Sequence, residues 1–255
     1  MGPVARGLAH RFRVLEPFQR GSGHEPLSVA RHVADLKALV DGRCGGAKPA
    51  LVGHSWGAML ALAYAGAHPG DVGALVLVGC GTFDRVSRDR MRKALDARLD
   101  DGLRERLRRL PDEVADADER FRAMGELLLP AYSYDLVSFD PEIVACDARA
   151  HEETWDDMVR LQEAGVYPAA FRAITSPVLM LHGAADPHPG PMIRDALRAH
   201  LPHLEYREWA RCGHYPWLER AAREEFFACL SEWLGRRAAV SRVSPAAGSP
   251  RQDVS

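Results

Sequence analysis

The sequence predicts an α/β protein, in which a mostly parallel sheet has helices on both faces and carries a separate helical unit. Short apolar runs alternate with segments of helical periodicity, an order that is typical of parallel sheets. Between residues 82 and 173 charged residues dominate and strand-like runs are missing. We therefore expect a core made of residues 1–81 and 174–238, a helical cap over residues 82–173, and a disordered tail over residues 239–255, which lack any periodicity.

The first part of the chain is expected to supply helices and strands up to the cap. Residues 3–11 have the pattern of the last turns of a helix, and residues 12–17 that of a strand. Ser28 is a suitable N-cap for the next helix, because its side chain can accept a hydrogen bond from the first helical turn. The nearly continuous apolar run at 72–78 predicts a strand that is buried on both faces.

The second part of the core begins after the cap. Residues 177–183 predict another buried strand, and residues 192–201 a short helix. The alternation at 204–209 predicts a strand, and residues 219–234 have the apolar stripe of a final amphipathic helix. In parallel sheets of this kind the active site lies at the carboxyl ends of the strands. Polar residues directly after predicted strands are therefore the first candidates for function.

The composition excludes several classes of function. The chain has 255 residues and a formal net charge of −2, so it lacks the basic surplus of a nucleic-acid-binding protein. No segment is apolar enough to span a membrane, and the N-terminus lacks a signal-peptide pattern. The five cysteines are scattered without metal-binding spacing, which favours free thiols in a reducing compartment. We expect a cytoplasmic protein that acts on a small molecule; the sequence indicates no oligomeric state.

The motif Gly-His-Ser-Trp-Gly occupies residues 53–57, between a predicted strand and a predicted helix. A strand that turns into a helix through Gly-x-Ser-x-Gly is a nucleophile elbow. Its serine adopts a strained backbone conformation, and we expect both Gly53 and Gly57 to be needed where strand and helix approach each other. Ser55 would then stand at a helix N-terminus, whose free N–H groups favour a developing oxyanion. The alternative is a chance match in a glycine-rich chain.

Two further residues complete a possible catalytic set. A serine hydroxyl needs a base, and the base needs an orienting carboxylate. Asp186 follows one predicted strand and His214 follows the next. Simpler interpretations remain: Asp186 could form a turn before Pro187, and His214 could be a structural histidine. His188 is a rival base, although it shares the loop of Asp186.

The chain order Ser, Asp, His resembles that of the α/β-hydrolase superfamily, over about residues 3–237. The matching motifs are the elbow, the His-Gly-x-x-Asp segment at 182–186 and the Gly-His pair at 213–214. The resemblance implies the α/β-hydrolase fold and a serine hydrolase without metal or organic cofactor.

Carried over to this chain, the resemblance assigns Ser55 as nucleophile, His214 as base and Asp186 as the acid that orients the base. The backbone N–H of Trp56 would supply one oxyanion-hole donor. The family normally has two or three strands and a His-Gly oxyanion loop ahead of the helix in which this sequence starts. We expect that the start codon is assigned too late, that the chain is a fragment, or that a partner completes the sheet.

The segment Gln-Arg-Gly-Ser-Gly at 19–23 is similar to a loop of prolyl iminopeptidases, a subgroup with a helical cap. Phe18 stands where that subgroup has Asp, and His54 replaces a glycine of its elbow. In the cap, Glu152 and Glu153 beside Trp155 could bind the amino group of a substrate, although an acidic pair on a helix is more often only solvated. Aromatic residues of the cap and its borders could line an apolar pocket: Tyr132, Tyr134, Trp155, Tyr167 and Phe171.

Two hypotheses of function follow from these residues. The first is a serine hydrolase that cleaves a small ester, amide or short peptide through an acyl-enzyme, with aminopeptidase specificity as a subtype. The second is a non-catalytic protein of the same fold that binds a small ligand, or an inactive fragment. An intact set of three catalytic residue types favours the first hypothesis.

Overall fold

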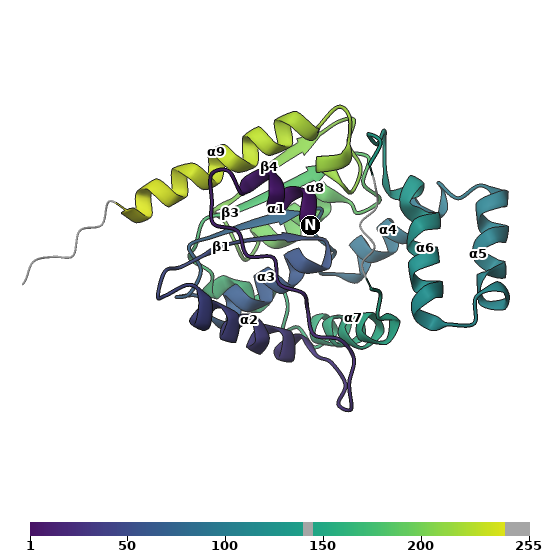
Figure 1. Cartoon of the computed structure of the whole chain (residues 1–255), viewed down its shortest axis with the longest axis horizontal. Helices are drawn as coiled ribbons and strands as arrows, with labels where there is room; N and C mark the ends of the chain where they lie inside the picture. The colour runs from purple at the N-terminus through teal and green to yellow at the C-terminus, as the bar shows by residue number, and fades with distance from the viewer. Residues whose placement is uncertain (140–144, 243–255) are drawn as a thin grey trace, which may run out of the picture.

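The computed structural model describes residues 1–139 and 145–242 and has a four-stranded parallel sheet between helices (Figure 1). The strands lie side by side in the order in which they occur in the sequence, β1-β2-β3-β4. Their bounds are β1 (Ala50–His54), β2 (Ala74–Val78), β3 (Val178–Gly183) and β4 (Leu204–Trp209). The predicted fold class is therefore confirmed, and the carboxyl ends of all four strands meet at one edge.

The two central strands separate two apolar clusters. Every residue of β2 and β3 is buried, as expected for strands covered on both faces. Because side chains alternate along a strand, Leu75 and Leu77 pack into one cluster, and Val76 and Val78 pack into the other. The first cluster also contains residues of α2 (Val29–Arg43), α3 (Trp56–Ala67) and α8 (Gly190–Arg198). The second contains residues of α1 (Gly2–Leu8) and α9 (Arg223–Arg242).

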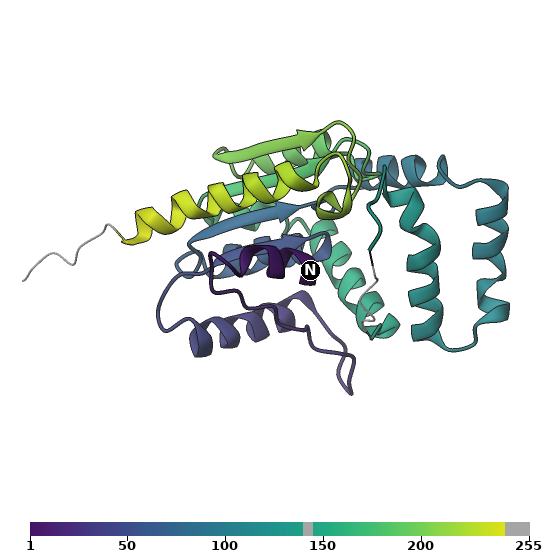
Figure 2. The same ribbon diagram turned by 45° about the horizontal axis from the view of Figure 1, so that its top comes forward.

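The segment between β2 and β3 is helical, as predicted. Its helices are α4 (Arg85–Asp96), α5 (Asp101–Glu113), α6 (Ala117–Tyr132), α7 (Ala148–Glu163) and the short 3₁₀ helix η1 (Ala169–Ala173). Each of α4 to α7 begins after an aspartate whose carboxylate accepts a backbone N–H of the first turn; these caps are Asp84, Asp100, Asp116 and Asp147. Helices α5 and α6 form a pair that projects from the sheet (Figure 2).

Two sequence-based expectations for the core are wrong. Residues 12–17 form no strand, because no described strand pairs with them. Their apolar side chains Phe12 and Val14 instead lie against the cluster of α1 and α9. The last helix is longer than expected: α9 continues to Arg242 and so includes residues 239–242, for which the sequence predicts a disordered tail. The remainder of that tail lies outside the described residues.

The described helices and cysteines can be compared with the expectations of no membrane-spanning segment and of free thiols. None of the described helices is long and apolar enough to cross a membrane. The cysteines Cys44, Cys80, Cys212 and Cys229 are free thiols. Burial raises the pKa of Cys80 and Cys212, so these two remain protonated. The short 3₁₀ helix η2 (Pro216–Leu218) lies between His214 and the start of α9.

Candidate active site

The turn between β1 and α3 has the geometry of a nucleophile elbow. Ser55 has φ +53° and ψ −117°, and it is the one non-glycine residue with positive φ in the described ranges. Such a conformation costs about 1–3 kcal/mol and persists only where the surroundings enforce it. A Cβ at Gly53 would lie 2.2 Å from the carbonyl oxygen of Gly57, so residue 53 must be glycine. A Cβ at Gly57 would meet no atom within 4 Å, so our expectation of steric need is wrong there.

Ser55 is attached to the neighbouring strand through its backbone. Its N–H donates to the carbonyl of Val78 at the end of β2 (2.9 Å). The next residue after Val78 is Gly79, with φ +51°, and a Cβ there would lie 2.9 Å from Nδ1 of His214. The elbow and the imidazole of His214 therefore share one end of the sheet. Within the described residues the Ser55 hydroxyl makes no hydrogen bond with His214; such bonds are often formed only when substrate binds.

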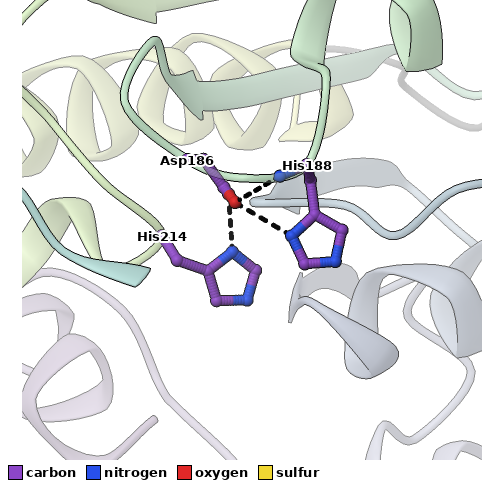
Figure 3. Close-up of side chains that lie close together, drawn as sticks. All are labelled: Asp186, His188 and His214. Carbon is purple, nitrogen blue, oxygen red and sulfur yellow. Dashed lines mark hydrogen bonds and ion pairs between the residues drawn. The ribbon is translucent and has the colours of Figure 1, made fainter. Parts of the chain in front are cut away.

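Asp186 and His214 form a hydrogen-bonded pair (Figure 3). Asp186 lies in the loop after β3 and His214 in the loop after β4, and Oδ2 of the carboxylate is 2.6 Å from Nδ1 of the imidazole. The two loops are joined by a hydrogen bond from the Ala185 N–H to the Cys212 carbonyl (2.8 Å). Because an ionised carboxylate only accepts, Nδ1 of His214 must donate. In the neutral imidazole Nε2 then keeps a free lone pair, which is the state of a general base.

The pKa shifts favour the same protonation states. Burial lowers the pKa of His214 below its ordinary value of 6.5, and the negative charge of Asp186 offsets part of this effect. Burial alone raises the pKa of the Asp186 carboxyl, but the charge of His214 and the hydrogen bonds from His188 and His214 outweigh it and hold the pKa well below its usual range. At neutral pH the pair is therefore a carboxylate and a neutral imidazole.

The backbone of His214 is held from two sides. Its N–H donates to the carbonyl of Tyr132, the last residue of α6 (2.8 Å). Its carbonyl accepts a hydrogen bond from Nε2 of His54, in the elbow strand (3.0 Å). The ring of Tyr132 also contacts the imidazole of His214, with 5.4 Å between ring centroids. The helical segment between β2 and β3 therefore contributes directly to the position of the candidate base.

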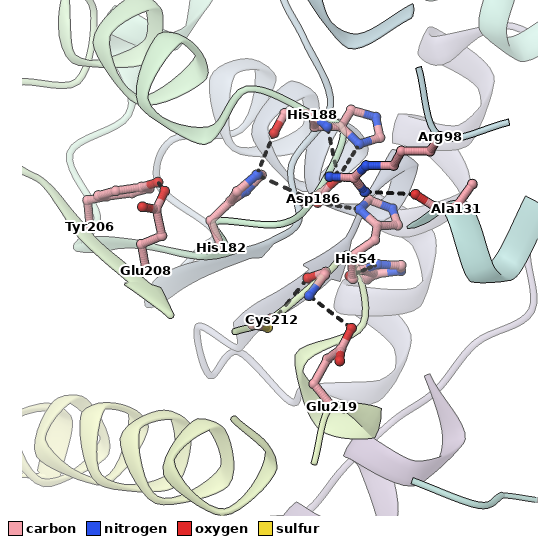
Figure 4. Close-up of polar contacts among 12 residues, drawn as sticks. His54, Arg98, Ala131, His182, Asp186, His188, Tyr206, Glu208, Cys212 and Glu219 are labelled. Atoms are coloured by element: carbon pink, nitrogen blue, oxygen red, sulfur yellow. Dashed lines mark hydrogen bonds and ion pairs between the residues drawn. The ribbon is translucent and has the colours of Figure 1, made fainter. Parts of the chain in front are cut away.

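Glu219 holds the loop that carries His214, a role that our sequence interpretation missed (Figure 4). Its fully buried carboxylate accepts the N–H groups of Gly213 (2.9 Å), Tyr134 (2.8 Å) and Asp135 (2.7 Å). Two of these donors lie more than 80 positions away in the chain. No local pattern could have indicated this bond, because Glu219 looks like an ordinary polar residue near the start of a helix.

His188 lies beside His214 and binds the other oxygen of the Asp186 carboxylate. Both its backbone N–H and its ring Nδ1 are 2.9 Å from Oδ1 of Asp186. Its ring is stacked on that of His214, with centroids 4.7 Å apart and planes 18° apart. One ligand atom from each of Asp186, His188 and His214 lies within 4.8 Å of the others, so the group could hold a metal ion. The hydrogen bonds on Asp186 explain this proximity without one.

Trp56 is the candidate oxyanion donor. Trp56 is the first residue of α3, and among the described residues its backbone N–H has no acceptor, as expected in a first helical turn. Its indole N–H donates to the side chain of Gln19 (3.0 Å). The loop whose sequence is similar to that of prolyl iminopeptidases is thus joined to the elbow by one hydrogen bond.

The candidate substrate-binding residues of the cap have different surroundings. Glu153 accepts the N–H of Leu27 (2.8 Å) and a hydrogen bond from Arg149 (2.7 Å), so it already has two structural partners. Glu152 is exposed. Trp155 is partly buried against the apolar cluster that contains residues of α2, α3 and α8. Of the expected aromatic lining, Phe171 is fully buried within that cluster and belongs to the core.

Comparison with known proteins was made by sequence and by structure. The sequence model of a family described as "Alpha/beta hydrolase family" matches residues 1–228. No curated protein matches the chain. A thermophilic esterase from Thermogutta terrifontis is 20% identical with a TM-score of 0.60, over 92% of this chain and 84% of that one. A mutant of the meta-cleavage product hydrolase CumD is 18% identical with a TM-score of 0.56, over 92% and 84%. The monoacylglycerol lipase of Paleococcus ferrophilus is 18% identical with a TM-score of 0.50, over 84% and 77%.

Proposed function

We propose that this chain, which belongs to the alpha/beta hydrolase family, is a serine hydrolase that cleaves a small ester or amide through a Ser55–His214–Asp186 triad. The observation that carries the proposal is the 2.6 Å hydrogen bond between Asp186 and His214 beside the strained backbone of Ser55. A strained non-glycine residue and a buried acid–base pair each cost free energy, and such features cluster at functional sites. Both occur here at the same edge of the sheet, which supports a catalytic site at that place.

The proposed reaction uses each group in one role. Ser55 Oγ attacks the carbonyl carbon of the substrate while Nε2 of His214 accepts the hydroxyl proton. The carboxylate of Asp186 stabilises the imidazolium that results, and the N–H of Trp56 donates to the oxyanion. His214 then gives the proton to the leaving alcohol or amine as the acyl-enzyme forms. Water attacks the acyl-enzyme by the same route, which releases the acid and restores Ser55.

An ester is the substrate class that the surroundings support best. A peptidase that recognises a free amino terminus needs an acidic group that faces the substrate; of the two candidates, Glu153 is already bonded to Leu27 and Arg149, and Glu152 is exposed to solvent. Two of the similar structures carry the names esterase and monoacylglycerol lipase, and we carry ester hydrolysis over from them as part of the proposal. Trp155, partly buried at the helical segment, is our candidate for an apolar wall of the substrate site.

A non-catalytic, ligand-binding protein is the second candidate. The observation in its favour is that the Ser55 hydroxyl makes no hydrogen bond with His214 among the described residues. Covalent labelling distinguishes the two candidates, because a fluorophosphonate reacts only with an activated serine.

The experiment is labelling of the purified protein with a fluorophosphonate, read by intact mass. We expect the wild type to gain one probe mass and the Ser55→Ala variant to gain none. Ser231→Ala is the matched control, because Ser231 lies on α9 and is bonded to Arg11; this variant should label like the wild type. Hydrolysis of p-nitrophenyl butyrate but not of alanine p-nitroanilide would support an esterase over an aminopeptidase. A folded wild-type protein that takes up no probe would contradict the serine hydrolase and favour the binding protein.

A further inference from the structure

The carboxylate of Asp186 is bonded on both of its oxygens. Oδ2 accepts from Nδ1 of His214 (2.6 Å), and Oδ1 accepts from the backbone N–H and the ring Nδ1 of His188 (both 2.9 Å). Since a carboxylate has no proton to give, both imidazoles donate their Nδ1–H groups to it. The acid of the proposed triad therefore serves two histidines, of which only His214 is needed as a base.

The bonds to Oδ1 decide where Oδ2 points. The terminal torsion of an aspartate side chain has a broad distribution, so the torsion alone does not fix the plane of the carboxylate. Another possible hydrogen-bond donor to this carboxylate lies close by: Nε2 of His182 is 3.6 Å from Oδ2. Without the ring donor of His188 on Oδ1, the buried carboxylate would have more freedom to rotate, and such a rotation would weaken the bond to His214.

His188 removes that competitor as well. Its own carbonyl accepts the Nε2–H of His182 (3.0 Å), so this donor is already used. The ring of His188 is buried and stacked on the ring of His214, which limits the rotation of both imidazoles. One residue thus fixes the carboxylate, occupies the neighbouring donor and supports one face of the base.

We propose that His188 is a positioning residue of the hydrolase site, which holds the Asp186 carboxylate so that Oδ2 faces His214. The catalytic consequence rests on the proposed function, whereas the geometric claim does not. The ring N–H of His188 is the group that acts, since the backbone N–H on the same oxygen is present in every variant. A side chain that keeps an N–H at this place should therefore preserve the alignment.

Two substitutions separate alignment from simple packing. His188→Leu fills the space but has no donor, and we expect it to slow fluorophosphonate labelling about 10- to 100-fold, the range for loss of a hydrogen bond to a charged group. His188→Asn places an amide N–H near the position of Nδ1 and should restore the rate to within a few-fold of wild type. His203→Gln is the control, because His203 is bonded to the Ser176 carbonyl elsewhere in the fold; its rate should not change.

Proton NMR tests the geometric claim without any activity. In a Ser55→Ala background the Nδ1–H of His214, in a short bond to a carboxylate, should give a strongly downfield resonance. We expect His188→Leu to shift or broaden this resonance and His188→Asn to keep it. If the Leu variant kept both the resonance and the labelling rate, or if the Asn variant were as impaired as the Leu variant in both, the proposal would be wrong. A wild-type protein that does not label would overturn the proposed function, while the resonance would still decide the role of His188.

Discussion

Carboxylates occur both in the loops after β3 and β4 and on the α5–α6 helix pair, but their partners differ in kind. In the loops, the buried carboxylates of Asp186 and Glu219 each accept three hydrogen bonds. On the helix pair, exposed ion pairs join neighbouring turns, as between Glu105 and Arg108 (2.6 Å) or Arg122 and Glu126 (2.6 Å).

This difference shows which side chains the fold holds in a fixed orientation. A buried carboxylate is costly unless all its acceptor sites are occupied, so its partners fix its orientation. An exposed ion pair contributes little, because water and salt compete for both partners. The loops therefore can hold chemistry in place, whereas the helix pair owes its structure to capping aspartates and apolar contacts.

The sharpest test of this contrast is Asp186→Asn. An asparagine can rotate so that its amide donates to His214, which stabilises the wrong tautomer of the base. We expect the rate of fluorophosphonate labelling to fall on the order of 10⁴-fold, with the circular dichroism spectrum unchanged. Asp116→Asn at the cap of α6 is the matched change on the helix pair and should label normally. Equal rates in the two variants would show that the buried acid has no special role.

The second test is the dependence of labelling on pH. The base must be neutral, and burial lowers the pKa of His214 below 6.5. We therefore expect the midpoint of the acid limb of labelling to lie below pH 6.5, with a loss of about tenfold per pH unit below that midpoint. The same pKa shifts also affect the free energy of unfolding. Both groups have a lower pKa in the folded protein than in the unfolded chain, so they stabilise the fold fully at a pH above their ordinary pKa. This stabilisation is lost as the pH falls through the pKa of each group in the folded protein. Thermal unfolding at the same pH values separates protonation of the base from loss of the folded protein. An acid limb with its midpoint above pH 6.5 in folded protein would contradict the lowered pKa of His214.

The third test has the smallest expected effect and compares the thermal stability of two glutamate variants. Glu219→Gln removes the charge that three N–H groups share and turns an amide donor toward one of them. We expect a loss of about 2–3 kcal/mol in the free energy of unfolding, or about 5–10 °C in Tm. Glu105→Gln breaks only an exposed pair with Arg108 and should leave Tm unchanged. Similar shifts in both variants would mean that burial does not distinguish the two regions.

Local patterns were enough to predict the α/β class, the helical segment between β2 and β3, and the order Ser55, Asp186, His214 at strand ends. They suffice because strand alternation, helix caps and the elbow each depend on residues a few positions apart. The catalytic roles of the three residues stay a prediction, although the structure brings Asp186 and His214 together and places the elbow beside them.

Tertiary structure decided the remaining features. Residues 12–17 have apolar character suited to a strand, yet a strand also needs a partner, and none of the described strands provides one. The sequence interpretation treated His188 as a rival base, and only the fold shows that it bonds to the second carboxylate oxygen of Asp186. Tyr132 reaches the loop of His214 from a distant part of the chain, and Glu219 joins that loop to the equally distant Tyr134 and Asp135. Contacts across 80 positions depend on how whole elements pack, and no spacing within a single segment records them.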